Sequence, residues 1–504
     1  MQTHPFRTPC KLGLLLAGSA ALFTTACGGS DLDGAGAVES SAAALGASTT
    51  PYEAESLTRI ASAIGSKVTW ESAASGSKYV EFNGTASQGA WIEFTLPNVA
   101  AGTYNLKLLF KANTNRGIVQ ASVDGANQGA TCNEYAAAAA YQVSCSLGSK
   151  TLSAGNHQIR FTVVGKSSSS SGYQMVVDQI SLSARATGPC DIYGAGGTPC
   201  VAAHSTVRAL FGAYNGKLYQ VRNAAGATKD INTMTTGGAA DAAAQDAFCA
   251  GTTCVITVVY DQSGKGNDLW YQGAGSPVGG KDQPANATGE SIKISGNKAY
   301  SLYINLGNSY WVDGSQHGVP LGSAPEAMYM VTSGTHYNGG AAFDYGNGPL
   351  ARGYAGFGVT DAVNLSSNTM WGSGAGAGPW VMADFDGLYT QSTLNPPTNL
   401  NDPTQTAPFV TALLKNNGTT EFTLRGGNAT SGNLGTYFKG ALPTGASPMK
   451  KQGAIVLGSG SDCCVTKTNL DRGTFYEGCL VSGYPSDATE DAVQANIIAA
   501  GYGK

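Results

Sequence analysis

Hydrophobic and polar residues alternate in a series of short stretches between residues 52 and 184. Glycine, asparagine and proline separate these stretches at short intervals. Successive side chains of a β-strand point to opposite faces, so such alternation predicts strands with one buried face. Many short strands divided by turn residues are typical of a β-sandwich. The expected strands are Val68–Trp70, Lys78–Phe82, Ala90–Leu96, Gly102–Phe110, Val119–Asp124 and His157–Val163.

A glycine-rich turn opens onto another short alternating strand in the segment 371–386, WGSGAGAGPWVMADFD. This strand is expected to present Asp384 and Asp386 on one face. A second acidic turn, ending at Asp462, follows the apolar run Ala454–Leu457. Two carboxylates on strand ends beside a tryptophan suit glycosidic bond hydrolysis, which needs an acid, a nucleophile or base, and a flat apolar surface. The glycine-rich run has no Lys-Ser/Thr after it and is not a phosphate loop.

The composition changes this picture little. Glycine supplies 69 of 504 residues, about twice its usual ~7% share, and charged residues only 12%. We therefore predict an all-β fold of two jelly-roll-like β-sandwich domains in tandem. The net charge of −4 gives no argument for nucleic acid as a partner.

The first 27 residues have the features of an export signal. Arg7 and Lys11 precede an apolar core at residues 12–23, and small residues precede Cys27. This resembles a bacterial lipoprotein box, with Cys27 as the acylated residue. Thr24 stands where leucine is usual, so simple secretion is the alternative. The core is shorter than the ~20 residues of a membrane span. We expect a bacterial protein outside the cell or on its surface, touching the membrane only through a lipid anchor.

Eleven cysteines fit an oxidising compartment. Three pairs are close enough in sequence to form local disulfides: Cys132 with Cys145, Cys190 with Cys200, and Cys249 with Cys254. Cys463 and Cys464 are adjacent, and Cys479 is left over. Metal binding by these cysteines is disfavoured, because neither a CxxC pair nor a histidine cluster accompanies them.

The N-terminal strands resemble a carbohydrate-binding module of the family 6/35 type. The resemblance rests on Tyr52–Glu55, Gly102–Tyr104, Val123–Gly125 and Val176–Leu182. It implies a structural calcium ion held by Glu53, Glu55 and Asp178, which agrees with the preference of Ca²⁺ for carboxylate oxygens. Solvated charges at strand edges are the alternative. The expected organisation is a signal at 1–27, a flexible linker at 28–51, this module at 52–184, and a catalytic domain at 188–504.

The second domain resembles the catalytic domain of glycoside hydrolase family 54, the α-L-arabinofuranosidase B family. The resemblance spans about 315 residues. The blocks that carry it are Gly188–Tyr193, Thr198–Thr206, Ala244–Cys249, Tyr260–Asn267, Gly334–Asn338, Phe343–Asn347, Gly473–Gly478 and Ser482–Ser486.

The resemblance implies a retaining hydrolase with Asp462 as acid/base, Asp386 as nucleophile, and Trp371 and Asp384 in contact with the sugar. In such enzymes the two catalytic carboxyl groups lie ~5–5.5 Å apart. It also implies the disulfides Cys190–Cys200 and Cys249–Cys254. Simple core packing is the alternative role for Trp371. No cofactor is expected for catalysis.

This sequence departs from the family pattern in three places. Asp386 replaces a glutamate, Gly387 and Leu388 replace two asparagines, and Ala341–Ala342 replaces an adjacent-cysteine disulfide that lines the sugar pocket. We hypothesise that a vicinal disulfide between Cys463 and Cys464 forms an equivalent wall and contacts the substrate. The alternative is that one of them pairs with Cys479.

The expected function is exo-acting removal of arabinose side chains from plant arabinoxylan or arabinan by a monomer. The alternatives are hydrolysis of another furanoside, such as a galactofuranoside, and sugar binding at the cell surface without catalysis. Glu477 is a further carboxylate that could act as the nucleophile if Asp386 does not.

Overall fold

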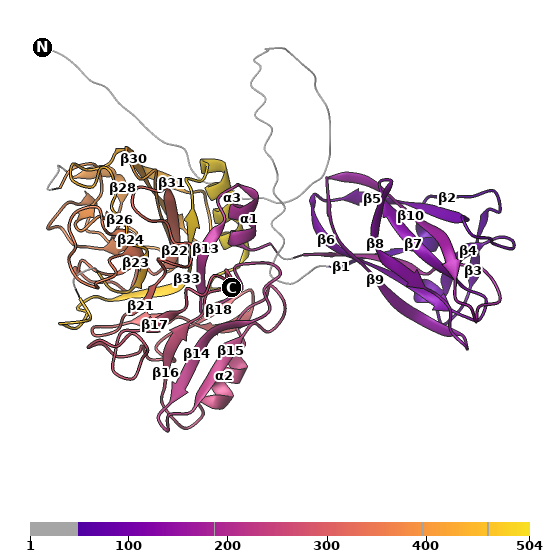
Figure 1. Cartoon of the computed structure of the whole chain (residues 1–504), viewed down its shortest axis with the longest axis horizontal. Helices are drawn as coiled ribbons and strands as arrows, with labels where there is room; N and C mark the ends of the chain where they lie inside the picture. The colour runs from indigo at the N-terminus through magenta and orange to yellow at the C-terminus, as the bar shows by residue number, and fades with distance from the viewer. Residues whose placement is uncertain (1–48, 186, 395–397, 461–462) are drawn as a thin grey trace, which may run out of the picture. The chain divides into compact units, whose positions relative to one another are not determined.

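The computed structural model describes residues 49–185, 187–394, 398–460 and 463–504 (Figure 1). Cys27 and Asp462 lie outside these residues. The described part is mostly antiparallel strand with few helices, which confirms the all-β prediction. Within it, none of the helices is long and apolar enough to cross a bilayer.

The alternating stretches of the N-terminal part form strands close to the predicted bounds. One sheet has the order β1 (Thr49–Glu53), β12 (Gln179–Ala184), β6 (Gly102–Ala112), β9 (Ala140–Leu152). A second has the order β2 (Arg59–Ala61), β5 (Trp91–Val99), β10 (Gly155–Lys166), β7 (Gly117–Val123), β8 (Ala126–Asn133). A third joins β11 (Val176–Val177), β4 (Lys78–Phe82) and β3 (Ser66–Trp70).

One hydrophobic core draws on both larger N-terminal sheets. Leu108 of β6 and Phe94 and Phe161 of the second sheet belong to it, and all three are fully buried. The two phenylalanine rings meet edge to face with centroids 6.2 Å apart. Alternate residues of β7 are buried, as the sequence pattern requires of a sheet with one face on the core.

The C-terminal part is built on two large sheets. The seven-stranded sheet consists of β13 (Cys200–Ser205), β33 (Gly473–Ser482), β22 (Glu326–Thr332), β29 (Val410–Asn416), β30 (Glu421–Asn428) and β31 (Gly435–Ala441), with β20 (Leu302–Ile304) paired to β33. The ten-stranded sheet has the order β15 (Thr228–Asn232), β14 (Lys217–Asn223), β16 (Cys254–Val259), β17 (Leu269–Tyr271), β21 (Tyr310–Asp313), β32 (Ala454–Leu457), β23 (Asp344–Gly348), β24 (Asp361–Ser366), β26 (Trp380–Asp384), β27 (Leu388–Tyr389).

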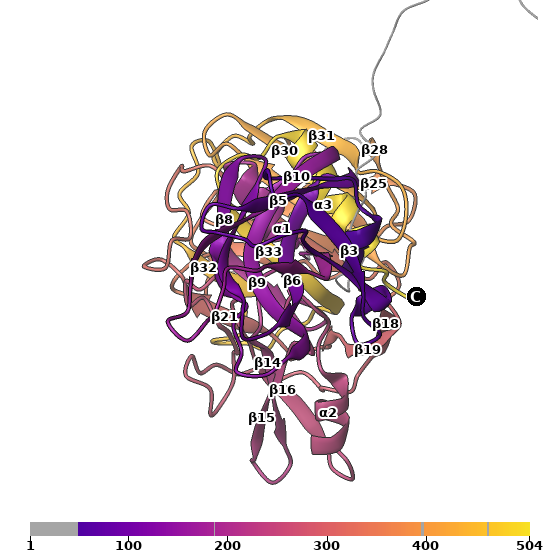
Figure 2. The same ribbon diagram turned by 90° about the vertical axis from the view of Figure 1, so that its right-hand side faces the viewer.

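Smaller elements complete this part. The pairs are β18 (Ser291–Ile294) with β19 (Asn297–Tyr300), and β25 (Gly374–Ala375) with β28 (Asn399–Pro403). The α-helices are α1 (Pro189–Ala195), α2 (Ala242–Phe248) and α3 (Asp487–Ala499). Helix α2 lies beside β15, as Figures 1 and 2 show.

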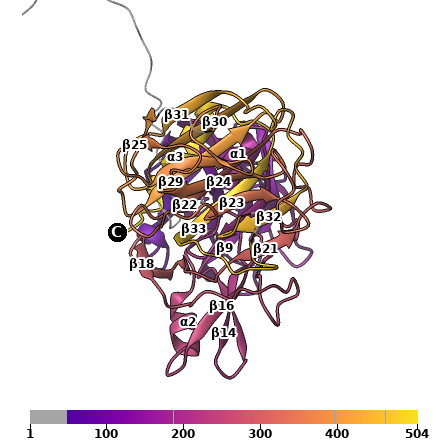
Figure 3. The same ribbon diagram turned by 90° about the vertical axis from the view of Figure 1, so that its left-hand side faces the viewer.

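The seven-stranded sheet is buried on both faces. Met328 and Met330 of β22 pack into a core shared with β23, β24 and β26 of the ten-stranded sheet. Tyr329 and Val331 face the other way, into a core that includes residues of α1 and α3. Figure 3 shows β22 and β29 against β23 and β24. This burial on both faces explains why β22, Glu326–Thr332, is a continuous buried run without alternation.

Candidate active site

A cavity of about 550 Å³ opens beside the end of β26. Its volume lies within the ~300–1,000 Å³ usual for ligand sites. The described lining comes from five segments that are far apart in sequence: Gly340–Ala342, Tyr354 with Phe357, Trp371, Asp384 with Asp386–Leu388, and Gly460 with Cys463, Lys467, Thr468, Leu470 and Asp471.

Strand β26 divides its side chains between the domain core and this cavity. Val381 and Ala383 face the core between the sheets. Trp380 and Met382 face the other way and pack against Trp371. Asp384 follows on that second face and lines the cavity. The predicted alternation is therefore correct up to Asp384.

Asp386 lines the cavity from a turn and not, as predicted, from the strand that carries Asp384. β26 ends at Asp384, and a hairpin turn joins it to β27, with Asp384 opposite Leu388. The Phe385 N–H donates to the Gly387 carbonyl across 3.1 Å, and Asp386 has a φ of +65°. Aspartate tolerates this left-handed conformation better than most residues. Both carboxylates thus line one cavity, but only Asp384 belongs to the strand.

Hydrogen bonds fix the Asp386 turn from both sides. The Thr360 N–H donates to Oδ2 of Asp386 across 3.2 Å, and the Thr360 hydroxyl donates to Oδ1 across 3.1 Å. Asp384 Oδ1 accepts the N–H groups of Asp386 and Gly387, at 2.7 and 3.1 Å. Asp384 therefore positions the turn that carries the proposed nucleophile, in addition to facing the cavity.

A second carboxyl group lies behind Asp384. Asp344 of β23 is fully buried, and its Oδ1 accepts the Asn364 side-chain amide across 2.7 Å. Burial, reinforced by the neighbouring Asp384, raises the pKa of Asp344 well above its ordinary value. Burial and then the charge of Asp386 raise the pKa of Asp384 to about 7. Burial thus favours the protonated form of Asp344.

The raised pKa of Asp384 gives a stability prediction. Its unfolded-state pKa is about 3.9, so between about pH 4 and 7 the folded state holds a proton that the unfolded state has lost. The free energy of unfolding of the wild type should therefore fall relative to that of Asp384→Asn as pH rises from about 4 to 7. Above pH 7 the difference between the two proteins should stay constant. Urea unfolding at a series of pH values measures this difference. A difference that is flat or opposite in sign from pH 4 to 7 contradicts the assignment.

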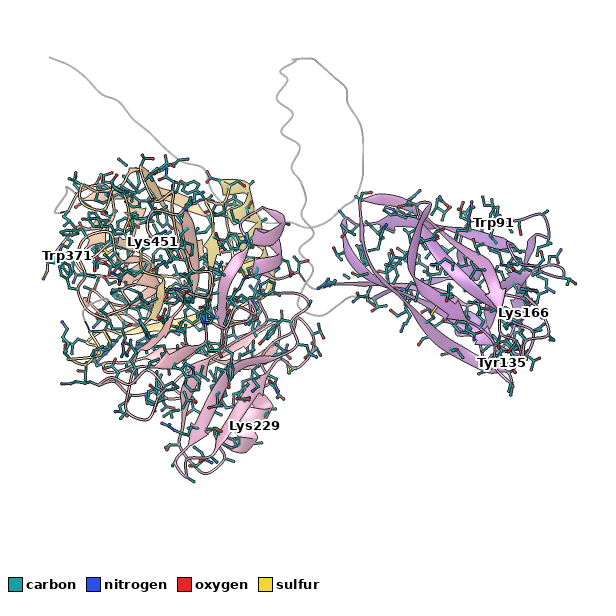
Figure 4. All side chains as sticks on the ribbon, in the orientation of Figure 1. Trp91, Tyr135, Lys166, Lys229, Trp371 and Lys451 are labelled. Carbon is teal, nitrogen blue, oxygen red and sulfur yellow. A yellow bond between two sulfur atoms is a disulfide. The ribbon has the colours of Figure 1, made fainter. Side chains whose placement is uncertain are left out.

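Trp371 packs against its neighbours and also lines the cavity, and its contact with the sugar stays a prediction. Its partly buried side chain packs on Trp380, Met382 and Leu388, and it lines the cavity. Figure 4 shows it at the edge of its domain, in contrast to the buried Lys451.

The cysteines pair as hypothesised from the sequence. The structure contains Cys132–Cys145, Cys190–Cys200, Cys249–Cys254 and the vicinal Cys463–Cys464. Cys479 is a buried free thiol, so the alternative pairing with Cys479 is not formed.

The vicinal disulfide lies at the cavity that Ala341 and Ala342 also line, since Cys463 is part of the same lining. A Cβ placed on Gly460 would lie only 2.7 Å from the Cβ of Ala342, so Gly460 packs directly on Ala342. Asp462 lies outside the described residues. Its neighbours Gly460 and Cys463 both line the cavity.

Several lining residues were not predicted. Asp471, Lys467, Leu470, Tyr354 and Phe357 lie in irregular segments with no periodic pattern. Their only signal in the sequence was nearness to recognised blocks.

Glu477, considered a spare carboxylate, is fully buried in β33. It is paired with Arg208 and accepts hydrogen bonds from Tyr329 and Tyr502. Its role is therefore structural.

In the N-terminal part, Glu53, Glu55 and Asp178 converge on the turn at Ser75–Gly76. Ser75 donates its N–H to Asp178 across 3.1 Å and its hydroxyl to Glu53 across 2.8 Å. One buried oxygen of each carboxylate has no hydrogen-bond partner. Burial, with repulsion from Glu53 and Glu55, raises the pKa of Asp178 to about 6. Unpaired carboxylate oxygens that repel one another fit a hard cation such as Ca²⁺.

Residues 189–503 match the family model described as alpha-L-arabinofuranosidase B, catalytic. The chain belongs to this family. It is similar to the alpha-L-arabinofuranosidase B of Emericella nidulans, with 50% identity over 326 residues, 63% of this chain and 62% of that protein. It is also similar to an alpha-L-arabinofuranosidase of Hypocrea jecorina, with 50% identity over 325 residues, 63% of each chain.

A solved arabinofuranosidase in complex with arabinofuranosyl-α-1,2-xylobiose has a TM-score of 0.59 to this chain and is 46% identical, covering 63% of this chain and 66% of that one. The matching region spans about 63% of the length of the curated arabinofuranosidases to which the chain is similar. The N-terminal part resembles a family 35 carbohydrate-binding module from Clostridium thermocellum only distantly, with a TM-score of 0.21.

Proposed function

We propose that this arabinofuranosidase-family chain is a retaining exo-α-L-arabinofuranosidase that releases arabinose side chains from plant hemicellulose or pectin. The supporting observation is the cavity in which Asp384 and Asp386 lie beside Trp371, with the residues flanking Asp462 in the same lining.

In this mechanism Asp386 attacks the anomeric carbon while Asp462 protonates the departing glycosidic oxygen. The Asp386 carboxylate then leaves when a water molecule, deprotonated by Asp462, attacks the same carbon. Asp386 is partly exposed at the cavity and held by Thr360, which fixes its direction of attack. Asp384 accepts hydrogen bonds from hydroxyl groups of the furanose and holds the Asp386 turn.

Incubating the purified chain with an aryl α-L-arabinofuranoside, with the product anomer followed by NMR, tests this function. Release of the α-anomer of arabinose as first product supports it, and release of the β-anomer contradicts retention.

The replacements at Gly387, Leu388 and Ala341–Ala342 favour a second candidate, hydrolysis of another furanoside. An aryl galactofuranoside tests that candidate in parallel. Failure with both substrates points to sugar binding without catalysis.

We further propose that the vicinal disulfide forms part of the sugar-binding wall. Cys463→Ala/Cys464→Ala is expected to raise KM for the arabinofuranoside roughly tenfold, because an apolar contact worth about 1.4 kcal/mol is lost. Steady-state kinetics measures this change, and Cys479→Ala, a buried cysteine in β33, is the control. An unchanged KM contradicts the proposal.

The Glu53, Glu55 and Asp178 cluster is proposed to hold a calcium ion that stabilises an N-terminal carbohydrate-binding module. Calcium at about 100 times its dissociation constant should stabilise this part by about 3 kcal/mol relative to the chelated chain. Thermal unfolding of the full chain in CaCl₂ and in EDTA measures the shift. Asp178→Asn should abolish it, whereas Glu93→Gln, which removes a surface partner of Arg160, should not. Equal transitions in CaCl₂ and EDTA contradict the site.

The chain is also proposed to act outside a bacterial cell as a monomer anchored through an acylated Cys27. The disulfides support an oxidising location. Metabolic labelling with a radioactive fatty acid, with Cys27→Ser as the control, tests the anchor.

A further inference from the structure

Asp344 lies directly behind the cavity without being part of its described lining. It is fully buried at the start of β23. Its Oδ1 accepts the Asn364 side-chain amide across 2.7 Å, and the same amide nitrogen donates to the carbonyl of the lining residue Ala341 across 3.3 Å. One oxygen of the Asp344 carboxyl group is therefore tied to the cavity wall.

The segment that precedes Asp462 also packs on Asp344. The Gly458 N–H donates to the Asp344 carbonyl across 2.8 Å. A Cβ placed on Gly460 would lie 3.5 Å from Oδ2 of Asp344. This oxygen therefore lies close to the main chain of a residue that lines the cavity, two positions before the proposed acid/base.

Oδ2 of Asp344 is buried, and no N–H or hydroxyl group of the described residues donates to it. The charge that acts most strongly on this carboxyl group is that of Asp384. Strand β23 pairs with β24, which pairs with β26, and the row that ends at Asp384 contains only Gly346 and Ala362 (Figure 3). These small residues leave space in which the two carboxyl groups face each other.

The surroundings of this pair decide which of the two carboxyl groups holds a proton. Two buried carboxyl groups that face each other are not both ionised, because the like charges repel. Oδ1 of Asp384 accepts the N–H groups of Asp386 and Gly387, which favours the ionised form of Asp384. No comparable donors reach Oδ2 of Asp344 from the described residues, so the proton belongs on Asp344.

We propose that Asp344 is a positioning residue of the reaction, whose protonated carboxyl group donates a hydrogen bond to Asp384 and keeps Asp384 an acceptor for the Asp386 turn and for the sugar. This inference rests on the proposed function, in which Asp386 attacks and Asp384 binds the furanose. Asp344 does not line the described cavity and acts only through Asp384.

Other ionisable groups face this pair and contribute to its pH dependence. They come from the turn after β26, from β27 and from the irregular segments of the lining: Asp386, Tyr389, Tyr354, Lys467 and Asp471. Variants of Asp344 leave all of them in place. A difference in pH dependence between such variants therefore belongs to the pair of Asp344 and Asp384.

The pH profile of kcat/KM for an aryl α-L-arabinofuranoside tests this role, because kcat/KM reports ionisations of the free enzyme. Asp384, with a pKa of about 7, ionises along the acid limb, where kcat/KM falls as pH falls. Asp344→Ala removes the donor, so the pKa of Asp384 should rise and the limb should move to higher pH by about one unit. Below the limb this is an about tenfold loss of kcat/KM, and above it the loss should be less than about twofold.

Asp344→Asn should restore the wild-type limb. Its amide nitrogen can donate to Asp384, and its oxygen can accept from Asn364. Asp402→Ala is the matched control, since Asp402 of β28 is also fully buried and burial raises its pKa well above its ordinary value. Asp402 is not part of the described lining, so its variant should keep the wild-type limb whatever its effect on stability.

Infrared difference spectroscopy gives a readout that needs neither activity nor a folded Asp344→Ala. The spectrum of the wild type minus that of Asp344→Asn, at mildly alkaline pH, should show the carbonyl band of one protonated carboxyl group. Absence of this band overturns the proposal with the proposed function intact.

The kinetic outcomes are equally decisive. An acid limb that moves to lower pH in both Asp344 variants overturns the proposal, because Asp344 would then be a negative charge that repels Asp384. An unmoved limb in folded Asp344→Ala, or a limb that Asp344→Asn does not restore, overturns it as well. If the wild type hydrolyses neither aryl furanoside, the proposed function fails, and this role fails with it whatever the spectrum shows.

Discussion

Asp386→Asn should lower kcat/KM for an aryl α-L-arabinofuranoside by at least about 10³-fold. The amide cannot form the glycosyl ester through which the retaining reaction passes. The fold should be little affected, because the amide oxygen still accepts a hydrogen bond from Thr360 and Asp384 still holds the turn. Initial rates with wild type and variant, with thermal unfolding as a check on folding, measure the effect.

Azide makes this prediction specific to the nucleophile. In Asp386→Gly the small anion fits the space of the lost side chain and attacks the anomeric carbon from the same side; glycine adopts the positive φ of this position readily. The Asp386→Gly variant with azide should therefore release the aryl group and form the β-configured arabinosyl azide. Thr390→Val, which alters a buried hydroxyl outside the described cavity lining, should retain wild-type activity without azide. Asp386→Asn activity above a tenth of wild type would make Asp386 a positioning residue.

The second large effect is expected on stability. Lys451 is fully buried between Glu326 of β22 and Asp361 of β24, with Nζ–O distances of 3.1 and 3.2 Å. Lys451→Met would leave two carboxylates buried without their cation, which costs about 3–5 kcal/mol of unfolding free energy. Denaturant unfolding at pH 7.5 to 8 measures the loss, and the solvent-exposed neighbour variant Lys450→Met should change stability by less than about 0.5 kcal/mol.

The sign of the pH effect provides a separate check on this ion cluster. Burial raises the pKa of Glu326 to about 7 even with Lys451 beside it, and loss of the cation raises it further. Acidification then protonates the orphaned carboxyl groups in the folded variant. The destabilisation by Lys451→Met should therefore shrink as pH falls from 8 to 5. A constant difference over that range would mean that lost packing, and not buried charge, dominates.

The sequence by itself determined the features that depend on neighbouring residues. Alternation located β4, β5, β6, β7 and β10 within a few residues, because one buried face fixes the period of a strand. Short separations predicted three disulfides, and contiguous blocks identified the family. The same alternation placed Asp384 on the cavity face of β26.

The tertiary structure alone decided which distant residues meet. Asp471 and Tyr354 line the cavity from irregular segments, so no periodic pattern marked them. Asp344 lay in a recognised block, but only the pairing of β23 with β24, next to β26, brings it behind Asp384. Asp386 left the strand because its turn is set by hydrogen bonds to Thr360 and Asp384, which no strand pattern encodes. Cys463 lies at the cavity with Ala341 and Ala342, more than a hundred residues earlier, because β32 and β23 are paired in one sheet. Side-chain period is a local property, whereas the composition of a pocket depends on how strands are ordered across a sheet.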